Sequence, residues 1–364
     1  KRTIQSLYPL AAIAAIGVAG IFCGCSNSAE NNDYGFEVAV KAPDKVVSDS
    51  IAPIEHVDTV NLVCPDSVIL SSIKQVYAAD DMFVVVDNMF TVHGFKADGS
   101  YVCGYGRRGE APDEYVNMGA CAVTPTGNEV VIVDSYAQRM LFYDLRSGEF
   151  KQRVEFPVGT LDMVQQCVFL SDSVALLARY VYNNKNAVYA VANIADKTVE
   201  DFDSVGLRTE NVAMPTGGHT IAEYQGKAVY VKPFEPAIYQ YPDTKWLYIE
   251  QDKKVYNEQE LAEISDFSMM TYLNAMNEGY CPGYTSVYVL KDWILLGFLD
   301  SEFSLIEKSG WKMTTYEYVK DNMAQHVNVA SIVGAIPERN VLICADNGPM
   351  SESDQIYIYK LPNR

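Results

Sequence analysis

The sequence has little positive charge, because 28 lysine and arginine residues stand against 47 aspartate and glutamate residues, for a formal net charge of -19. A protein that binds a nucleic-acid backbone needs a clustered basic face. The densest basic pair, Arg107-Arg108, is followed closely by Glu110, Asp113 and Glu114. We therefore expect no nucleic-acid partner.

Histidine is also scarce, and recognisable catalytic spacings are missing. The four histidines are His56, His93, His219 and His326, and no His-x-His or His-Glu-x-x-His arrangement occurs. No Gly-x-Ser-x-Gly segment marks a serine nucleophile. An enzyme would need histidines from distant segments to converge with carboxylates around a metal. The sequence indicates no cofactor and no metal, and it favours a protein that is not an enzyme.

A run long enough to span a membrane is missing near the N-terminus. The apolar run Leu10–Gly24 is shorter than the roughly 20 residues of a membrane-spanning helix, and it follows the basic pair Lys1-Arg2. This arrangement is typical of a signal peptide. The run ends at Gly24-Cys25 before a polar segment, which resembles a bacterial lipobox with Cys25 as the lipidated residue. An ordinary cleaved signal is the alternative.

The N-terminus therefore predicts a cellular location and a domain plan. Residues 1–25 are expected to be a lipoprotein signal peptide, 26–55 a flexible tether, and 56–364 one folded domain. An acyl anchor would hold the protein on a lipid bilayer, as an outer-membrane lipoprotein on the periplasmic or cell-surface side.

Closely spaced cysteine pairs are absent from the predicted domain. Its six cysteines are Cys64, Cys103, Cys121, Cys167, Cys281 and Cys344. An oxidising compartment and an even number permit disulfides. Most of these residues lie within apolar β runs, however, so buried thiols are the favoured interpretation. Cys103 with Cys121 is the candidate bridge.

What the sequence does contain is a repeat. The run Phe83–Asp87 and the run Val130–Asp134 are each followed by a polar break, a second β run and a turn. The two aspartates stand 47 residues apart. A repeat of this length, built from short β runs, is typical of propeller blades. An aspartate at the end of such a strand usually accepts hydrogen bonds from backbone N–H groups of its own turn.

Fainter groups of β runs continue to the C-terminus and bring the number of blades to six. The last group lacks an outer strand, and Val57–Val63 precedes the first inner strand. We therefore predict an all-β, six-bladed β-propeller in which the N-terminal strand closes the last blade, so that few strand edges stay exposed. The segment Asn257–Gly279 has helical periodicity and predicts one inserted helix, which either packs on the side of a blade or covers one face of the ring.

The connection between the two clear blades contains Gly106, Arg107, Gly109, Pro112, Glu114 and Tyr115. It resembles the crossing loop of NHL-type blades and, more closely, of the six-bladed propeller lipoproteins of Bacteroidota, which commonly reads Gly-Arg/Lys-x-Gly-x-Gly-Pro-Gly-Glu-Tyr. Ala111 and Asp113 replace two of its glycines. The resemblance covers residues 56–364 and implies the propeller fold, but it implies no particular ligand because the family largely lacks an assigned activity.

The candidate ligand-binding residues lie on this loop and near it: Arg107, Arg108, Glu110, Glu114, Arg139 and Tyr182. An Arg–Glu pair that locks two blades together is equally consistent with the loop. Tyr182 belongs to a set of aromatic residues that suits sugar rings, although half of such a set is expected in the core. The set is Tyr180, Tyr182, Tyr239, Tyr241, Trp246 and Tyr248. We expect an envelope binding module for a glycan, peptide or protein. The alternatives are a metal-dependent enzyme of the lactonase or polysaccharide-lyase kind and a TolB-like structural component, which would expose an apolar patch.

Overall fold

A computed structural model describes residues 35–43, 53–79, 81–181, 186–204, 211–212, 219–242, 245–264, 266–267, 269–298, 302–317, 332–345 and 354–364. All of these belong to one compact unit, Gly35–Arg364. The predicted signal peptide, with Cys25, lies outside the described residues.

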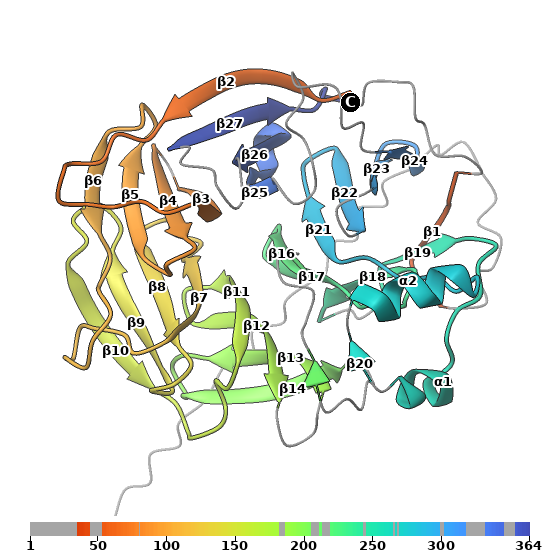
Figure 1. The fold of residues 1–364 in the computed structure, drawn as a ribbon, viewed down its shortest axis with the longest axis horizontal. Helices are drawn as coiled ribbons and strands as arrows, with labels where there is room; N and C mark the ends of the chain where they lie inside the picture. The colour runs from red at the N-terminus through yellow and green to blue at the C-terminus, as the bar shows by residue number, and fades with distance from the viewer. Residues whose placement is uncertain are drawn as a thin grey trace, which may run out of the picture. The chain divides into compact units, whose positions relative to one another are not determined.

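The unit is a six-bladed β-propeller, as the sequence predicted (Figure 1). Blades 1 to 3 are antiparallel four-stranded sheets that follow one another in sequence. Blade 1 contains β3 (Ile73–Ala79), β4 (Met82–Asp87), β5 (Val92–Lys96) and β6 (Tyr101–Gly104). Blade 2 contains β7 (Met118–Val123), β8 (Glu129–Asp134), β9 (Arg139–Asp144) and β10 (Phe150–Glu155). Blade 3 contains β11 (Val164–Ser171), β12 (Val174–Val181), β13 (Asn186–Asn193) and β14 (Thr198–Ser204).

Blades 4 to 6 follow the same order of strands, and two of them receive a strand from the N-terminal part of the domain. Blade 4 contains β16 (Ile221–Tyr224), β17 (Lys227–Val231), β18 (Ala237–Tyr241), β19 (Leu247–Glu250) and also β1 (Val38–Lys41). Blade 5 contains β21 (Ser286–Val289), β22 (Trp293–Phe298), β23 (Glu302–Glu307) and β24 (Lys312–Glu317). Blade 6 contains β25 (Ile332–Ile336), β26 (Val341–Ala345), β27 (Gln355–Lys360) and β2 (Glu55–Asn61).

The closing strand is confirmed. β2 pairs antiparallel with β27, so that Val60 lies opposite Ile356. Val60 is buried in the core cluster between blades 6 and 1. The first and last parts of the domain are therefore held together by one sheet, which satisfies the outer edge of β27.

The hydrophobic core is divided among the gaps between blades. Each of the six core clusters joins residues of two neighbouring blades. Because neighbouring blades cover both faces of a blade, the second strand of blade 1, β4, is buried along its whole length. The outer strand β10 is mostly exposed. This explains the continuous apolar runs, such as Phe83–Val86, in the middle of each repeat.

The predicted single helix at Asn257–Gly279 is wrong in one respect. The structure has two short helices, α1 (Glu258–Glu263) and α2 (Met269–Asn277), separated by β20 (Asp266–Phe267). β20 pairs with β15 (Asn211–Val212), and this pairing draws the backbone out of the helical conformation. The predicted capping box of Asn257 and Glu260 is present, and Gly279 follows the end of α2 with a φ of +81°.

Both helices pack against the side of a blade. Leu261 of α1 and Ala275 of α2 belong to the core cluster that contains Tyr230 and Phe234 of blade 4. Among the described residues, no helix is both long enough and apolar enough to cross a membrane.

Strand β1 departs from the predicted tether. The sequence predicted no strand before Val57, yet Val38–Lys41 runs parallel to β19 and gives blade 4 a fifth strand. Val40 is buried in the core cluster between blades 4 and 5. The tether prediction therefore does not hold for this stretch, because the edge of β19 offers backbone partners that local sequence does not reveal.

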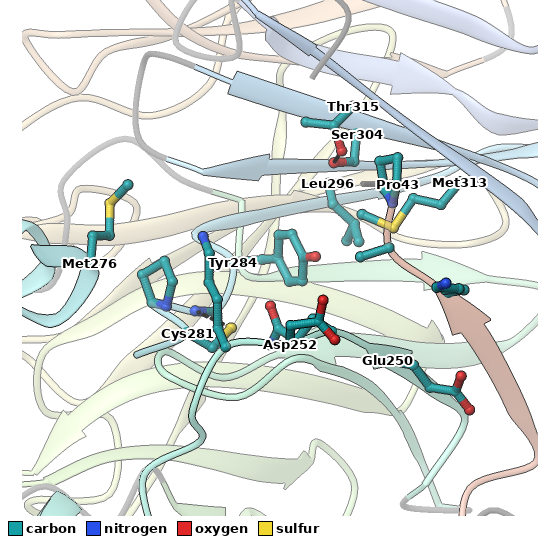
Figure 2. A pocket seen from close by; sticks show the side chains of 16 residues that line it. Pro43, Glu250, Asp252, Met276, Cys281, Tyr284, Leu296, Ser304, Met313 and Thr315 are labelled. Atoms are coloured by element: carbon teal, nitrogen blue, oxygen red, sulfur yellow. Dashed lines mark hydrogen bonds between the residues drawn. The ribbon is translucent and has the colours of Figure 1, made fainter. Parts of the chain in front are cut away.

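The cavities in the described part of the ring include two that concern the sites discussed below. One, of about 390 Å³, follows the axis and is lined by the inner strands of all six blades. The other, of about 490 Å³, lies between blades 4 and 5 beside the segment that follows β1 (Figure 2).

Candidate functional site

The aspartates that end β4 and β8 are structural, as predicted. Asp87 accepts hydrogen bonds from the backbone N–H groups of Thr91 (2.8 Å) and Ser71 (3.0 Å). Its carboxylate thus joins the turn after β4 to the chain that enters the inner strand β3. Because the N–H groups of Thr91 and Ser71 both donate to the buried Asp87 carboxylate, the turn after β4 and the chain entering β3 lie on the same face of the ring.

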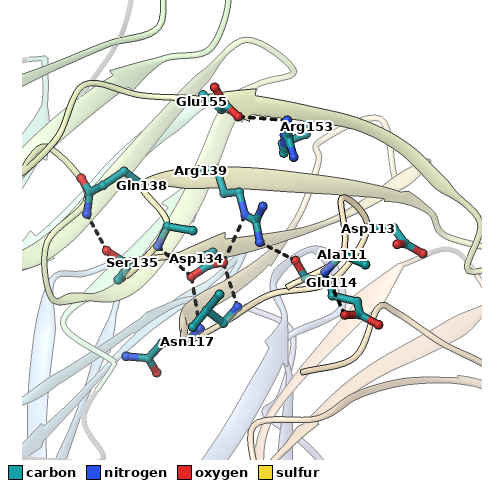
Figure 3. Close-up of polar contacts among 12 residues, drawn as sticks. Ala111, Asp113, Glu114, Asn117, Asp134, Ser135, Gln138, Arg139, Arg153 and Glu155 are labelled. Atoms are coloured by element: carbon teal, nitrogen blue, oxygen red, sulfur yellow. Dashed lines mark hydrogen bonds and ion pairs between the residues drawn. The ribbon is translucent and has the colours of Figure 1, made fainter. Parts of the chain in front are cut away.

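Asp134 repeats the arrangement in blade 2 (Figure 3). Its carboxylate accepts hydrogen bonds from the N–H groups of Val116 (2.9 Å), Asn117 (3.1 Å) and Ala137 (3.2 Å). It is fully buried, and these donors satisfy a charge that would otherwise be costly to bury.

Arg139, one of the predicted ligand-binding residues, belongs to the same network. Its Nε lies 3.2 Å from Asp134 Oδ2, and its Nη2 donates a hydrogen bond of 2.7 Å to the carbonyl oxygen of Glu114 (Figure 3). Only 7% of Arg139 is exposed. The side chain therefore ties blade 2 to the crossing loop from inside the protein.

The crossing loop contains a second ion pair. Arg107 Nε pairs with Glu114 Oε1, and Glu114 Oε2 accepts a hydrogen bond of 2.9 Å from the N–H of Ala111. The hydrogen bond from the Ala111 N–H is the main cause that lowers the pKa of the Glu114 carboxyl below its usual value, and the hydrogen bond from Arg107 is the second cause. A Cβ at Gly109 would lie 2.0 Å from Glu114 Oε2, so a larger residue at this position would displace the Glu114 carboxylate. The Arg107–Glu114 pair therefore closes the crossing loop on itself and does not join groups of two blades.

The remaining predicted residues lie apart from this network. Arg108 and Glu110 are exposed at the tip of the loop, and the side chain of Arg107 is itself 81% exposed. Tyr182 lies outside the described residues. Of the other aromatic residues in its set, Tyr239 and Trp246 are buried in blade 4.

Further hydrogen bonds extend the bracing across three blades. Tyr115 donates a hydrogen bond to the carbonyl of Phe90 in blade 1 (2.8 Å). The Gln138 amide bonds Asp162 (2.8 Å) and accepts from the N–H of Leu161 (2.9 Å), which precedes blade 3. Arg179 of blade 3 then donates to the carbonyl of Thr160 (2.7 Å). The turns and connections on this face form one continuous hydrogen-bonded assembly.

Large apolar side chains project from these braced loops. We define the apolar rim as six exposed residues on the loops of blades 1 to 3: Ile69, Met89, Phe90, Tyr136, Val158 and Met163. Val158 is 95% exposed, Ile69 86% and Tyr136 75%. Isolated exposed apolar residues are ordinary, whereas a group on one face marks an interaction surface.

Sequence reasoning missed the apolar rim, although a signal for it was present. Met89 and Tyr136 each stand two residues after a strand-ending aspartate, in the middle of a turn. Turns at such positions usually carry Gly, Asn, Asp or Ser. A large apolar residue at the same place in both repeats therefore indicated a surface role.

The histidines do not form one site among the described residues. His219 lines the axial cavity, and burial lowers its pKa to about 4, so its imidazole is neutral at pH 7. The ring lies 5.1 Å from that of Tyr288. His93 bonds Thr91 (2.8 Å) in blade 1, His56 is exposed, and His326 lies outside the described residues. Within the described ranges, no three potential ligands gather as a metal site.

The six cysteines of the described residues form no disulfide. Cys121 and Cys167 are buried, and burial raises the pKa of the Cys121 thiol to about 12. The buried-thiol interpretation is therefore confirmed for these residues, and the candidate bridge between Cys103 and Cys121 is absent.

Comparisons with known proteins support the fold. Residues 36–331 match the family model DUF4934, described as a domain of unknown function. A protein of Bacteroides fragilis NCTC 9343, described as exported, is similar with a TM-score of 0.55 and 13% identity, over 90% of this chain and 99% of that one. A member of the DUF4221 family from Bacteroides vulgatus ATCC 8482 gives a TM-score of 0.52 and 10% identity, over 85% and 99%. No curated protein matches the chain.

Proposed function

The chain belongs to the DUF4934 family, and we propose that it is an envelope-anchored binding module whose apolar rim receives a segment of a partner protein. The observation that carries this proposal is the group of exposed apolar side chains on one braced face of blades 1 to 3. Among the functions that the sequence left open, a component of an envelope assembly is the one for which an exposed apolar patch was expected.

The rim is held in place before any partner arrives. Phe90 is fixed by Tyr115, and the turn with Tyr136 is fixed by Asp134 through the N–H of Ala137. Loops that are already ordered lose little conformational entropy on binding, so more of the contact energy appears as affinity. The ion pairs of Arg139 and Arg107 thus support the binding face, and Arg108 and Glu110 are exposed beside it.

The backbone at the rim points to the same conclusion. Phe90 and Met163 both have positive φ values, 59° and 48°. A residue with a side chain in this conformation is strained, and glycine or asparagine would relieve the strain. At both positions the backbone conformation is unfavourable for the residue, and an apolar side chain is exposed to solvent. Neither feature stabilises the fold.

Charge distinguishes among the possible occupants of the rim. The chain carries a formal net charge of -19, which opposes association with a second copy and with the surface of an anionic bilayer. A polypeptide segment that combines apolar side chains with lysine or arginine is attracted instead. We take such a segment as the partner.

The N-terminal sequence and one of the similar structures support the proposed location. An acyl group on Cys25 would anchor the chain to a lipid bilayer, and one of the similar structures is described as an exported protein. We therefore place the protein at the envelope, as an outer-membrane lipoprotein with its propeller on the periplasmic or cell-surface side.

The proposal is tested by selecting peptides from a displayed library of random peptides against the wild-type protein. Selected peptides are expected to be rich in aromatic or aliphatic residues and in lysine or arginine. Phe90→Asn and Tyr136→Ser should each weaken the binding of a selected peptide at least tenfold, as expected for hot-spot side chains. Val57→Ser, which replaces an exposed apolar residue on β2, is the matched control and should bind normally.

Three outcomes would overturn the proposal. The first is a failure to enrich any peptide that distinguishes wild type from Phe90→Asn. The second is a wild-type dimer in light scattering that Phe90→Asn converts to a monomer, which would make a second copy the occupant. The third is binding of the unlipidated protein to phosphatidylglycerol vesicles that depends on Phe90, which would make the occupant a membrane.

A further inference from the structure

The cavity between blades 4 and 5 has walls from four distant parts of the chain (Figure 2). One wall is the segment Lys41–Pro43 after β1, and another is the segment Glu250–Lys253 after β19. A third is Cys281–Tyr284, which leads into β21. The strands of blade 5 complete the cavity with Leu296, Ser304, Met313 and Thr315.

The wall formed by Cys281–Tyr284 is rigidly positioned. The N–H of Cys281 donates to the carbonyl of Lys254 (2.7 Å), and the carbonyl of Pro282 accepts from the N–H of Phe234 (2.9 Å). Gly283 has a φ of +72°, and a Cβ there would lie 2.5 Å from the backbone nitrogen of Phe234. The backbone therefore approaches blade 4 as closely as only glycine permits, and the cavity is preformed.

An unsatisfied polar group lines this cavity. The amide nitrogen of Gln251 is buried and interacts with the Cys281 thiol, a weak acceptor, but it makes no hydrogen bond of good geometry among the described residues. Buried donors without partners are rare in folded proteins because each loses its bonds to water without a replacement. A ligand that brings an acceptor to Gln251 would remove this deficit.

The rest of the lining offers hydroxyl groups and apolar surface. Ser304 and Thr315 are buried and share a hydrogen bond of 2.8 Å. Tyr284 contributes an aromatic ring, and Met276 and Met313 contribute thioether side chains. This combination suits a compact molecule that has one apolar face and hydrogen-bonding groups around its edge.

Charges are balanced and lie outside the interior. The four charged residues of the lining are exposed, and Lys41 and Lys253 offset Glu250 and Asp252. A ligand with its own charge would lose water without gaining a buried counter-charge among the lining residues. The carboxylates at the mouth accept hydrogen bonds, as the hydroxyl groups of a neutral ligand require.

We propose that this cavity is a binding site for a neutral saccharide. The sugar ring packs its C–H face against the apolar lining, its hydroxyl oxygens accept from the Gln251 amide, and its hydroxyl groups donate to Glu250 and Asp252. This site is separate from the apolar rim and does not depend on the proposed partner segment.

Strand β1 couples to this site. Val38 and Ala42 donate backbone hydrogen bonds to the carbonyls of Trp246 (3.0 Å) and Glu250 (2.8 Å), and the next residues form one wall of the cavity. A bound saccharide therefore stabilises the docking of β1 on β19, because undocking would dismantle part of its site.

The test is calorimetric titration of the full chain with glucose, galactose, mannose, N-acetylglucosamine and disaccharides of these sugars. At least one is expected to bind. Gln251→Leu should weaken binding by about threefold to tenfold, the effect of one hydrogen bond. Asp252→Ala alters an exposed side chain and should weaken binding to a similar degree without affecting folding. Gln152→Leu, on the exposed strand β10, is the matched control and should leave affinity unchanged.

Hydrogen exchange gives a readout that does not depend on the variants, since the saccharide should slow amide exchange in Val38–Lys41. The proposal is overturned if no sugar binds, or if Gln251→Leu and Asp252→Ala both bind as wild type does. It is also overturned if glycine or glutamate binds this site in preference to sugars. A sugar whose binding is lost in Phe90→Asn and kept in Gln251→Leu would place the site on the apolar rim.

Discussion

Replacing Arg139 with methionine tests whether the buried network beside the crossing loop holds blade 2 together. Methionine keeps much of the side-chain length and removes the guanidinium. The substitution deletes the ion pair with Asp134 (3.2 Å) and the hydrogen bond to the carbonyl of Glu114 (2.7 Å). Both interactions lie in the protein interior, since Arg139 is 7% exposed and Asp134 is fully buried.

The structure sets the expected magnitude. Removing one member of a buried ion pair costs about 3–5 kcal/mol when the remaining charge is left unsatisfied. Asp134 retains its bonds from Val116, Asn117 and Ala137, so its charge is still largely satisfied. The loss then approaches that of one hydrogen bond to a charged group, and we expect the free energy of unfolding to fall by about 2–3 kcal/mol.

The assay is urea denaturation followed by tryptophan fluorescence, with linear extrapolation to zero urea. Arg107→Met is the matched control, because it also removes an arginine from an ion pair but at a side chain that is 81% exposed. Its unfolding midpoint should fall much less than that of Arg139→Met, because one partner of the pair is exposed to water. The reasoning is refuted if Arg139→Met unfolds at the wild-type midpoint, or if the two variants lose the same stability.

Three further predictions concern strain, pH and ring closure. Met163→Asn should raise the free energy of unfolding by about 0.5–1 kcal/mol in urea, because asparagine tolerates the φ of 48° better; a loss of stability would contradict the strain. His219 has a folded-state pKa of about 4, below its unfolded value of about 6.5. The neutral imidazole therefore makes its full contribution to the free energy of unfolding above pH 6.5. This contribution, up to about 3 kcal/mol, is lost as the pH falls through 4. Melting temperatures measured from pH 7 to pH 4 should fall less in His219→Gln than in wild type, and parallel curves would exclude this role. A chain that begins at Leu62 lacks β2 and should be insoluble, whereas one that begins at Pro53 lacks only β1 and should stay soluble with a lower melting temperature; equal solubility would contradict closure by β2.

Much of the fold was predictable because its signals are local. The aspartates that end β4 and β8 stand in apolar runs followed by turn residues, and each bonds mainly with groups of its own blade. Closure by β2 was also predictable. The last blade lacks an outer strand of its own and needs one from elsewhere in the chain, and only one β run preceded the first blade. Burial of the second strands on both faces gave runs such as Phe83–Val86 their continuous apolar character.

Several features depended on partners that local sequence does not reveal. The helical pattern of Asn257–Gly279 is interrupted because Asp266 pairs with Asn211. Residues expected in the tether form a strand because the edge of β19 accepts Val38–Lys41. The capping box at Asn257 was predictable by contrast, since both of its hydrogen bonds span three residues.

The candidate sites divide in the same way. The sequence by itself placed arginine and glutamate residues together in one short crossing loop, whereas the structure decided that Arg107 pairs with Glu114. Only the tertiary structure decided that Arg139 is a buried brace, that exposed apolar residues of three blades share one face, and that Gln251 and Ser304 line one cavity. The physical reason is that a propeller brings each blade against its neighbours, so surfaces and cavities are built from residues far apart in the chain, whereas a strand or a turn is specified by residues next to one another.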